Sequence, residues 1–298
     1  MNNDLKQKVA LITGASSGIG QAVAQTMAAA GYTVYGTSRR ANYETVQVGD
    51  TCYTMVPMTL EDEKSVASAV DYILEKNGRI DVLVNAAGSG IAGAIEETTA
   101  AEARSQFDVC FFGIITVLNA VLPAMREAKS GIVINIGSMA SFFPIAFQGM
   151  YSAVKAALFM LSATLRMELK PFGIRVCTVE PGDTKTGFTE KRVFTQKSAQ
   201  TAYRKPMERA LYEMIRSELA AQGPQKCARM VLKAAQMKNP PVRMTVGLGN
   251  KILYVLSKLT SWRFKQSVLE SIYLRKDPPS DAVWTYEKQF KESINGRD

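Results

Sequence analysis

Two kinds of apolar pattern alternate along most of the chain. Short apolar runs, most of them rich in β-branched residues, predict buried strands at 9–12, 32–37, 53–58, 81–84, 132–136 and 173–179. Longer stretches between and after these runs predict helices at 21–30, 61–76, 102–127, 151–169 and 206–221. This alternation predicts an α/β fold in which helices cover both faces of one parallel sheet.

The length of 298 residues fits one large α/β domain or two small ones. The alternation continues without an internal repeat, which favours one domain. One strongly apolar run without charged residues, 109–125, is 17 residues long. That is at the short edge of the ~20 apolar residues that a membrane span needs. Because Asn119 and Pro123 lie inside it, we interpret it as a core or subunit-interface helix.

Charge and composition narrow the possible chemistry. Basic residues outnumber acidic ones by 36 to 27, and the net charge of +9 favours anionic ligands or surfaces. No run of Lys and Arg exceeds two residues, so we expect no nucleic acid partner. The chain has no histidine, which excludes Ser-His and Cys-His nucleophiles and most zinc sites. We therefore expect no metal site.

The four cysteines are widely separated and form no C-x-x-C pair. A reduced, intracellular compartment is the simplest interpretation. The polar start of the chain leads directly into the first strand, without the pattern of a signal peptide. The sequence therefore predicts a cytoplasmic location.

A glycine-rich turn, T-G-A-S-S-G-I-G from residue 13 to residue 20, joins the first strand to the first helix. Glycines leave backbone N–H groups and the helix N-terminus free to face a phosphate. The turn predicts a doubly wound, Rossmann-type sheet that binds a dinucleotide, although its spacing differs from the usual G-x-G-x-x-G. A tight structural turn without a ligand is the alternative. The predicted cofactor contacts here are Gly14, Ser16, Ser17, Gly18, Ile19 and Gly20.

The second strand leads into Ser38, Arg39 and Arg40, with no acidic residue among them. In a dinucleotide fold this strand end meets the adenosine ribose. An acid there accepts from the 2′-hydroxyl, whereas an arginine pairs with a 2′-phosphate. The sequence therefore predicts NADP rather than NAD, with contacts from Ser38 and Arg39. Two solvated surface arginines are the alternative.

A hydroxyl, a phenol and an ammonium lie at spacings that suit one proton-transfer site. Tyr151 and Lys155 are four residues apart, so on a helix their side chains share one face. Ser138 follows the strand at 132–136, and a strand end and the next helix would bring the three groups together. Taken singly, each residue has a simpler interpretation, as a packed aromatic, a solvated charge or a turn residue.

Jointly, these motifs resemble the short-chain dehydrogenase/reductase family over about residues 6–245. The resemblance rests on the glycine turn, Asn85-Ala-Ala-Gly88, Ser138, Tyr151-x-x-x-Lys155 and Pro181-Gly182. It implies that Tyr151 donates a proton to a carbonyl oxygen as hydride arrives from the nicotinamide, or accepts it in the reverse reaction. Lys155 would favour the ionised phenol and hold the nicotinamide ribose. Ser138 would orient the substrate oxygen.

The resemblance also implies further cofactor contacts. These are Asn85, Ala86, Gly88, Tyr151, Lys155, Pro181, Gly182, Thr184 and Thr186. Three positions depart from the family pattern: Cys110 and Ala86 replace asparagines, and Thr59 replaces an aspartate. In the family, the asparagine expected at Cys110 holds a water that links Lys155 to solvent, partly through its backbone carbonyl. Because Cys110 keeps a backbone carbonyl, the proton relay could persist in weaker form.

Family members bind substrate beside a variable segment that follows Pro-Gly, here a lid at about 187–223. Candidate wall residues are Phe142, Phe143, Phe147, Met150 and Phe188. An apolar, aromatic pocket suits a steroid, retinoid or long acyl ketone, although these residues could equally be core. The resemblance implies a catalytic domain at 1–245 and a C-terminal extension at 246–298, packed on or near the substrate side.

The extension mixes basic and apolar residues between Lys251 and Lys276, before Pro278-Pro279 and a polar tail. Such a segment could dock on the protein's own surface, cover the substrate pocket, or make peripheral contact with a membrane. Similar tails occur in reductases that resemble the 17β-hydroxysteroid and retinol dehydrogenases, which supports a bulky lipophilic substrate.

Three functions remain open from the sequence. The first is an NADPH-dependent oxidoreductase that interconverts a ketone and a secondary alcohol on a lipophilic substrate. The second is a 3-oxoacyl reductase acting on acyl carrier protein, whose acidic surface would suit the net charge. The third is a cofactor-binding sensor with little turnover, to which Cys110 points. The resemblance implies a homodimer or homotetramer through the helices around Phe112 and Leu158.

Overall fold

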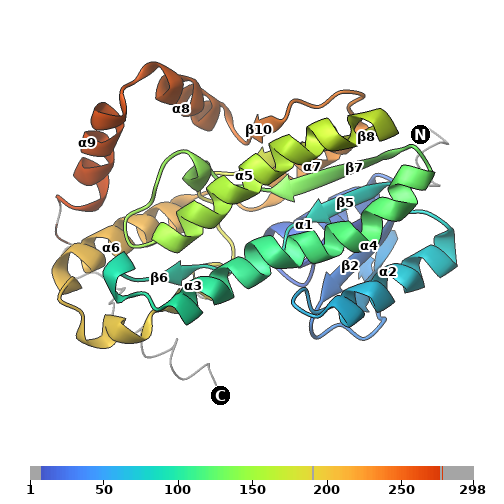
Figure 1. Ribbon diagram of the computed structural model, residues 1–298, viewed down its shortest axis with the longest axis horizontal. Helices are drawn as coiled ribbons and strands as arrows, with labels where there is room; N and C mark the ends of the chain where they lie inside the picture. Colours follow the sequence, from blue (N-terminus) through green and yellow to red (C-terminus); the bar gives the residue numbers. More distant parts are fainter. Residues whose placement is uncertain (1–7, 190, 276, 278–298) are drawn as a thin grey trace.

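The computed structural model describes residues 8–189, 191–275 and 277 (Figure 1). Its centre is an eight-stranded sheet with the strand order β10-β8-β7-β5-β1-β2-β4-β3. The strands are β1 Val9–Thr13, β2 Thr33–Ser38, β3 Thr45–Val48, β4 Thr51–Pro57, β5 Val82–Asn85, β7 Gly131–Ile136, β8 Ile174–Glu180 and β10 Arg243–Thr245. All pair in parallel except β3, which runs antiparallel to β4 at one edge.

Strand register aligns the ends of the central strands. Thr13 of β1 lies opposite Asn85 of β5, which lies opposite Asn135 of β7. The chain order reverses at β1, because β2 flanks it on one side and β5 on the other. In open α/β sheets, ligands bind at the carboxyl ends of the strands beside such a reversal.

Helices cover both faces of the sheet. On one face, α1 Gly18–Ala29 packs against α7 Gln225–Gln236. On the other face, the buried apolar core joins α2 Glu63–Asn77, α4 Gly113–Glu127 and α5 Gly149–Leu169 to the strands. The α/β fold with one doubly wound sheet, as the sequence predicts, is confirmed.

The helix predicted at 102–127 has a break in its regular geometry. It consists of α3 Ala100–Phe107, the π-helical turn η3 Asp108–Phe112, and α4. Within the part of the chain that the structure describes, this is the one helix long and apolar enough to cross a membrane. Both α3 and η3 pack on α5, and α4 packs on α2, so the whole helix lies in one helical layer of the domain.

The segment predicted as a lid has a small sheet of its own. Strand β9 Val193–Phe194 pairs in parallel with β6 Ile91–Ala92. The chain then continues through η6 Gln196–Gln200 into α6 Arg204–Ala220. Strands β6 and β9 and helix α6 share a small apolar cluster, whose buried residues are Ala92, Phe194, Met207, Ala210, Leu211 and Met214.

Two helices occupy the described part of the C-terminal extension, α8 Leu248–Leu259 and α9 Trp262–Tyr273. Helix α8 packs near β10, and α9 packs on α6. Figure 1 shows both at the end of the molecule toward which β7 points. The rest of the predicted extension, residue 276 and residues 278–298 with Pro278-Pro279, lies outside the described residues.

Candidate active site

Ser138 lies just beyond the carboxyl end of β7. It caps the short 3-10 turn η4 Met139–Ser141, and its Oγ accepts a 3.1 Å hydrogen bond from the N–H of Ala140. The chain reaches this turn through Gly137, where a Cβ atom would lie only 2.8 Å from Cγ of Glu180. The glycine therefore lets the Ser138 turn approach the end of β8 closely.

Tyr151 and Lys155 project from the first turns of α5. The Lys155 ammonium lies 5.7 Å from the centroid of the Tyr151 ring and donates a 2.9 Å hydrogen bond to the carbonyl oxygen of Ile136. Lys155 is only 6% exposed. Because Ile136 ends β7, the hydrogen bond ties the helix that carries the phenol to the strand that leads to Ser138.

The ring of Phe188 packs against Tyr151, with 5.6 Å between the ring centroids. Phe188 belongs to the predicted lid and sits beside Gly90, where a Cβ atom would lie 2.6 Å from Cζ of the ring. Among the other predicted wall residues, Phe142 and Phe143 contact each other with tilted rings. Phe147 packs on the buried cluster formed by β6, β9 and α6. The structure thus brings Phe188 to the candidate proton donor.

The glycine turn adopts the backbone that its composition predicts. Gly14 and Gly18 have φ values of +69° and +58°, a region that favours glycine. A Cβ atom at Gly20 would lie 2.3 Å from the carbonyl oxygen of Gly14, so the turn closes tightly on the start of α1. Ser17 occupies the N-cap position without a side-chain hydrogen bond to the helix, and Ser16 is exposed. The first N–H groups of a helix have no partner within the helix, so they can bind a ligand.

Lys191 from the lid reaches across this turn. Its ammonium donates a 3.1 Å hydrogen bond to Oγ of Ser17. The sequence analysis missed this residue, because 174 positions separate the two partners. A cation beside a helix N-terminus and a glycine turn adds to the positive potential there.

The loop after β5 is held in place by β1. The Oγ1 atom of Thr13 accepts hydrogen bonds of 3.1 Å from the N–H groups of both Ala86 and Ala87. The Asn85 side chain is 1% exposed and donates to Oδ1 of Asn135 at 2.8 Å. Its amide therefore links two strands inside the sheet, while residues 86–88 lie nearer the surface beside the glycine turn.

Cys110 lies within the π-helical turn η3 and is 1% exposed. Its Sγ accepts hydrogen bonds from Nε2 of Gln106 at 3.1 Å and from the N–H of Ser89 at 3.5 Å. These contacts join the helix to the loop after β5. The thiol thus has a packing role, and the role of this position in a proton relay stays a prediction.

Two further predicted segments lie at the same edge of the sheet. At the end of β2, Ser38 is half-buried, and Arg39 and Arg40 are exposed. After β8, the side chain of Thr184 donates to the carbonyl oxygen of Gly182 at 3.0 Å. A Cβ atom at Gly18 would lie 3.5 Å from Cβ of Thr186, so this loop adjoins the glycine turn.

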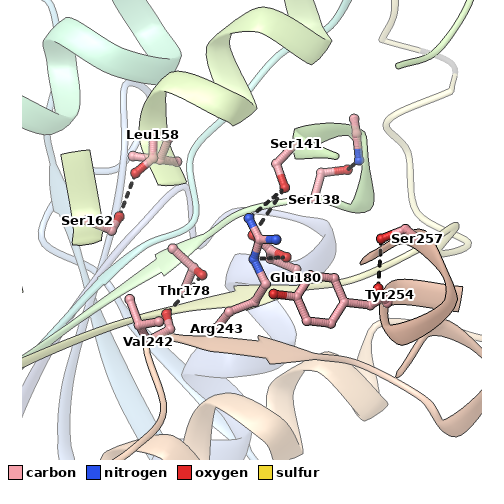
Figure 2. A network of polar contacts seen from close by, with 11 residues as sticks. Ser138, Ser141, Leu158, Ser162, Thr178, Glu180, Val242, Arg243, Tyr254 and Ser257 are labelled. Carbon is pink, nitrogen blue, oxygen red and sulfur yellow. Dashed lines mark hydrogen bonds and ion pairs between the residues drawn. The ribbon is translucent and has the colours of Figure 1, made fainter. Parts of the chain in front are cut away.

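A buried ion pair lies behind the Ser138 turn (Figure 2). Oε2 of Glu180 is 3.0 Å from Nε of Arg243, and the Glu180 side chain is fully buried. Burial raises the pKa of the Glu180 carboxyl to about 7, against the opposing effect of the guanidinium. The acid directly before Pro181 is a sequence signal for such a pair, because a buried carboxylate needs a partner.

Comparisons with known proteins agree with this arrangement. Residues 8–197 match the family model described as short chain dehydrogenase. The chain belongs to the short-chain dehydrogenase/reductase family. It is 39% identical over 259 residues to a 3-ketodihydrosphingosine reductase of Bacteroides thetaiotaomicron, an alignment that covers 87% of this chain and 94% of that relative.

Two solved structures share the fold over most of their length. A short-chain dehydrogenase from Streptomyces avermitilis gives a TM-score of 0.74 at 33% identity, covering 91% of this chain and 98% of that one. A metagenomic short-chain oxidoreductase in complex with NADP gives a TM-score of 0.63 at 27% identity, covering 82% and 98%. The chain is therefore an oxidoreductase of a family that uses NAD or NADP. The roles of its individual site residues stay predictions.

Proposed function

We propose that the protein is an NADPH-dependent reductase of a ketone on a long, lipophilic substrate, with the reverse oxidation as the same chemistry. The observation that carries the proposal is the 39% identity to a 3-ketodihydrosphingosine reductase, over nearly the whole of that relative. A steroid- or retinoid-like ketone belongs to the same lipophilic class, and an extended acyl chain is the first substrate to test.

The choice of NADPH rests on the end of β2. Arg39 is exposed there, beside the glycine turn, and Gly36 to Ala41 contain no acidic residue that would repel a 2′-phosphate. The turn itself fits a dinucleotide, because Gly14 and Gly18 have left-handed φ values and α1 begins at Gly18. Lys191 provides a further cation over the same turn.

The proposed reaction needs a hydride and a proton. NADPH, when bound, supplies the hydride to the carbonyl carbon. The Tyr151 hydroxyl gives its proton to the carbonyl oxygen as negative charge develops there. The Lys155 ammonium, 5.7 Å from the phenol ring, stabilises the phenolate that remains, and the Ser138 hydroxyl orients the oxygen.

Aromatic side chains support a lipophilic substrate. Phe188 packs on Tyr151, and Phe142 packs on Tyr254 of α8, with 5.0 Å between the ring centroids. Phe142 follows the Ser138 turn directly, so apolar rings lie against Tyr151 and next to the turn that carries Ser138. An acyl chain that runs past these rings would bury apolar area, which favours binding.

The helices α8 and α9 provide the proposed membrane contact. They expose large apolar side chains, namely Leu248, Ile252, Leu253, Val255, Leu256, Leu259, Trp262, Phe264, Val268 and Ile272. Basic residues lie among these, and Glu270 is the one acid in 248–275. A basic amphipathic surface of this kind suits the interface of an anionic membrane. We place the enzyme in the cytoplasm, at the membrane surface, where a lipophilic ketone is concentrated.

A separate apolar surface suits the proposed homodimer or homotetramer. Phe112 is 53% exposed at the end of η3, directly before α4, and Met160 and Met167 are 63% and 69% exposed on α5. Large exposed apolar side chains on two neighbouring helices favour burial against a second copy of the chain.

Purified protein supplied with NADPH and a 3-keto sphingoid base in detergent micelles tests the proposal. We expect NADPH oxidation that Tyr151→Phe abolishes and that NADH supports poorly. Absence of turnover across long-chain ketones would reject the proposal. Tight NADPH binding that Tyr151→Phe leaves unchanged, without turnover, would favour the cofactor-binding sensor. Faster turnover of an acyl carrier protein thioester than of the free long-chain ketone would favour the 3-oxoacyl reductase.

A further inference from the structure

The Arg243 guanidinium lies among three aromatic rings. Its Cζ atom is 3.6 Å from the ring centroid of Phe159 and 5.0 Å from the ring centroids of both Phe142 and Tyr254. The side chain is only 10% exposed. A planar cation that is shielded from water interacts strongly with aromatic faces.

The polar edge of the same guanidinium points toward the Ser138 turn (Figure 2). Its Nε lies 3.0 Å from Oε2 of Glu180, and its Nη2 donates to Oγ of Ser141 at 3.4 Å. The Ser141 hydroxyl in turn donates to Oε1 of Glu180 at 3.3 Å. Ser141 and Ser138 are the last residue and the cap of the same short turn.

Three partners of Arg243 belong to segments with a predicted catalytic or cofactor role. Phe142 follows the Ser138 turn, and Phe159 lies one helical turn beyond Lys155 on α5. Glu180 immediately precedes Pro181 and Gly182. The Arg243 side chain therefore contacts three segments: the turn that carries Ser138, the helix that carries Tyr151, and the end of β8 that leads to Pro181 and Gly182.

Through Tyr254, the same side chain also reaches the C-terminal helices. Tyr254 is half-buried on α8, whereas most of its neighbours on that helix are exposed. Asn250, one turn earlier, lies against Gly182, where a Cβ atom would be 2.5 Å from its Nδ2. Helix α8 is thus held against the Arg243 cluster by Tyr254 and against Gly182 by Asn250.

We propose that Arg243 is a positioning residue for ketone reduction. Its guanidinium sets the Ser138 turn against α5, and it joins α8 to that turn. The effect on rate rests on the proposed function, whereas the mechanical coupling between α8 and the turn does not. Loss of the guanidinium lets the Ser138 hydroxyl drift from the carbonyl oxygen, and small displacements of this kind lower rates strongly.

Steady-state kinetics of Arg243→Met and Arg243→Lys test the effect on rate. We expect kcat/KM for the long-chain ketone to fall on the order of tenfold or more in Arg243→Met, with an unchanged Kd for NADPH. Arg243→Lys keeps a charge beside Glu180 but loses the planar stacking, so it should recover activity only in part.

Arg175→Met is the matched control. Arg175 lies on β8, where its guanidinium donates to the carbonyl oxygen of Met237 at 2.6 Å, far from the carboxyl ends of the strands. We expect Arg175→Met to lower Tm about as much as Arg243→Met does, but to leave kcat/KM per folded molecule unchanged. Equal kinetic losses in Arg175→Met and Arg243→Met would reduce Arg243 to a general stabilising residue and overturn the proposal.

Hydrogen exchange provides a readout that needs no turnover. We expect Arg243→Met and Tyr254→Leu each to raise exchange both in 139–147 and in α8, while the glycine turn at 14–20 keeps its protection. If the wild-type protein reduces no ketone, the proposed function fails, but this coupling can still be measured. Exchange in 139–147 that stays at the wild-type level in both variants would overturn the inference.

Discussion

The Lys155 ammonium donates a hydrogen bond of 2.9 Å to the main-chain carbonyl of Ile136, the last residue of β7. The interaction spans 19 positions in sequence and is almost fully buried. It orients the ammonium from one side, while the Tyr151 ring lies 5.7 Å away on another. The position of this lysine is therefore set by the strand that leads to Ser138.

Replacement of Lys155 by methionine should remove most of the activity. The phenolate of Tyr151 would lose its neighbouring cation, and proton transfer by a positioned side chain contributes about a hundredfold to ten-thousandfold in rate. We expect a loss of kcat of that order in assays with NADPH and a long-chain ketone. Lys170→Met, on an exposed lysine just after the same helix, is the control and should keep wild-type kcat. A Lys155→Met enzyme with near-normal kcat would contradict the assignment.

Arg39 should decide between the two nicotinamide cofactors. A hydrogen bond to a charged group contributes about 1.5–3 kcal/mol, so Arg39→Ala should raise the KM for NADPH roughly tenfold to a hundredfold. The KM for NADH, which has no 2′-phosphate, should change little. Arg40→Ala serves as the matched control, since Arg40 is the exposed neighbour on the same loop. A larger effect from Arg40→Ala would move the phosphate site to that residue.

The basic residues of α8 and α9 should drive binding to anionic membranes. Each basic residue near such a surface contributes about 1 kcal/mol, so Lys258→Glu, Arg263→Glu and Lys265→Glu combined should weaken binding roughly a hundredfold or more. Sedimentation with phosphatidylglycerol vesicles measures the loss, and phosphatidylcholine vesicles show the part that needs no anionic lipid.

A control variant with the same change in net charge shows whether vesicle binding depends on the α8–α9 surface or on the overall charge of the protein. Lys226, Arg229 and Lys233 are exposed on α7, which packs on α1 and is separate from α8 and α9 in sequence. The triple change of these residues to glutamate should leave most vesicle binding intact. Equal losses in the two triple variants would mean that overall charge, rather than the α8–α9 surface, attracts the protein.

The placement of Tyr151, Lys155 and the glycine turn could be predicted from sequence because local patterns determine it. Helical spacing places Tyr151 near Lys155, and a glycine turn between a strand and a helix has few other uses. The amphipathic pattern of α7 was also present, with Cys227, Ala228 and Val231 buried, but the sequence analysis did not use it. The edge strand β3 was missed because its four side chains are exposed or half-buried, so no apolar run marks it.

Other features depend on contacts between distant segments, which no local pattern encodes. Lys191 meets Ser17 across the lid, and Arg243 meets Phe142 and Phe159 across the sheet edge. The Asn85 side chain donates to Asn135, which lies opposite it in the strand register, while its cofactor contact stays a prediction. Register and tertiary approach, rather than residue type, determine these roles.

Glu180 should make stability depend on pH in an unusual direction. Burial raises the pKa of its carboxyl to about 7 from the usual 4.5, although Arg243 and Ser141 oppose the shift. Between these two values the unfolded chain releases the proton that the folded protein keeps, so stability falls as pH rises. The total loss is about 3 kcal/mol, and it is complete above the folded-state pKa. Glu180→Gln cannot titrate, so its free energy of unfolding relative to wild type should improve by about that amount from about pH 5 to about pH 8. Urea unfolding at both pH values measures the difference, with Glu168→Gln on an exposed position of α5 as the control. A difference that stays constant with pH would mean that the Arg243 ion pair keeps Glu180 ionised throughout.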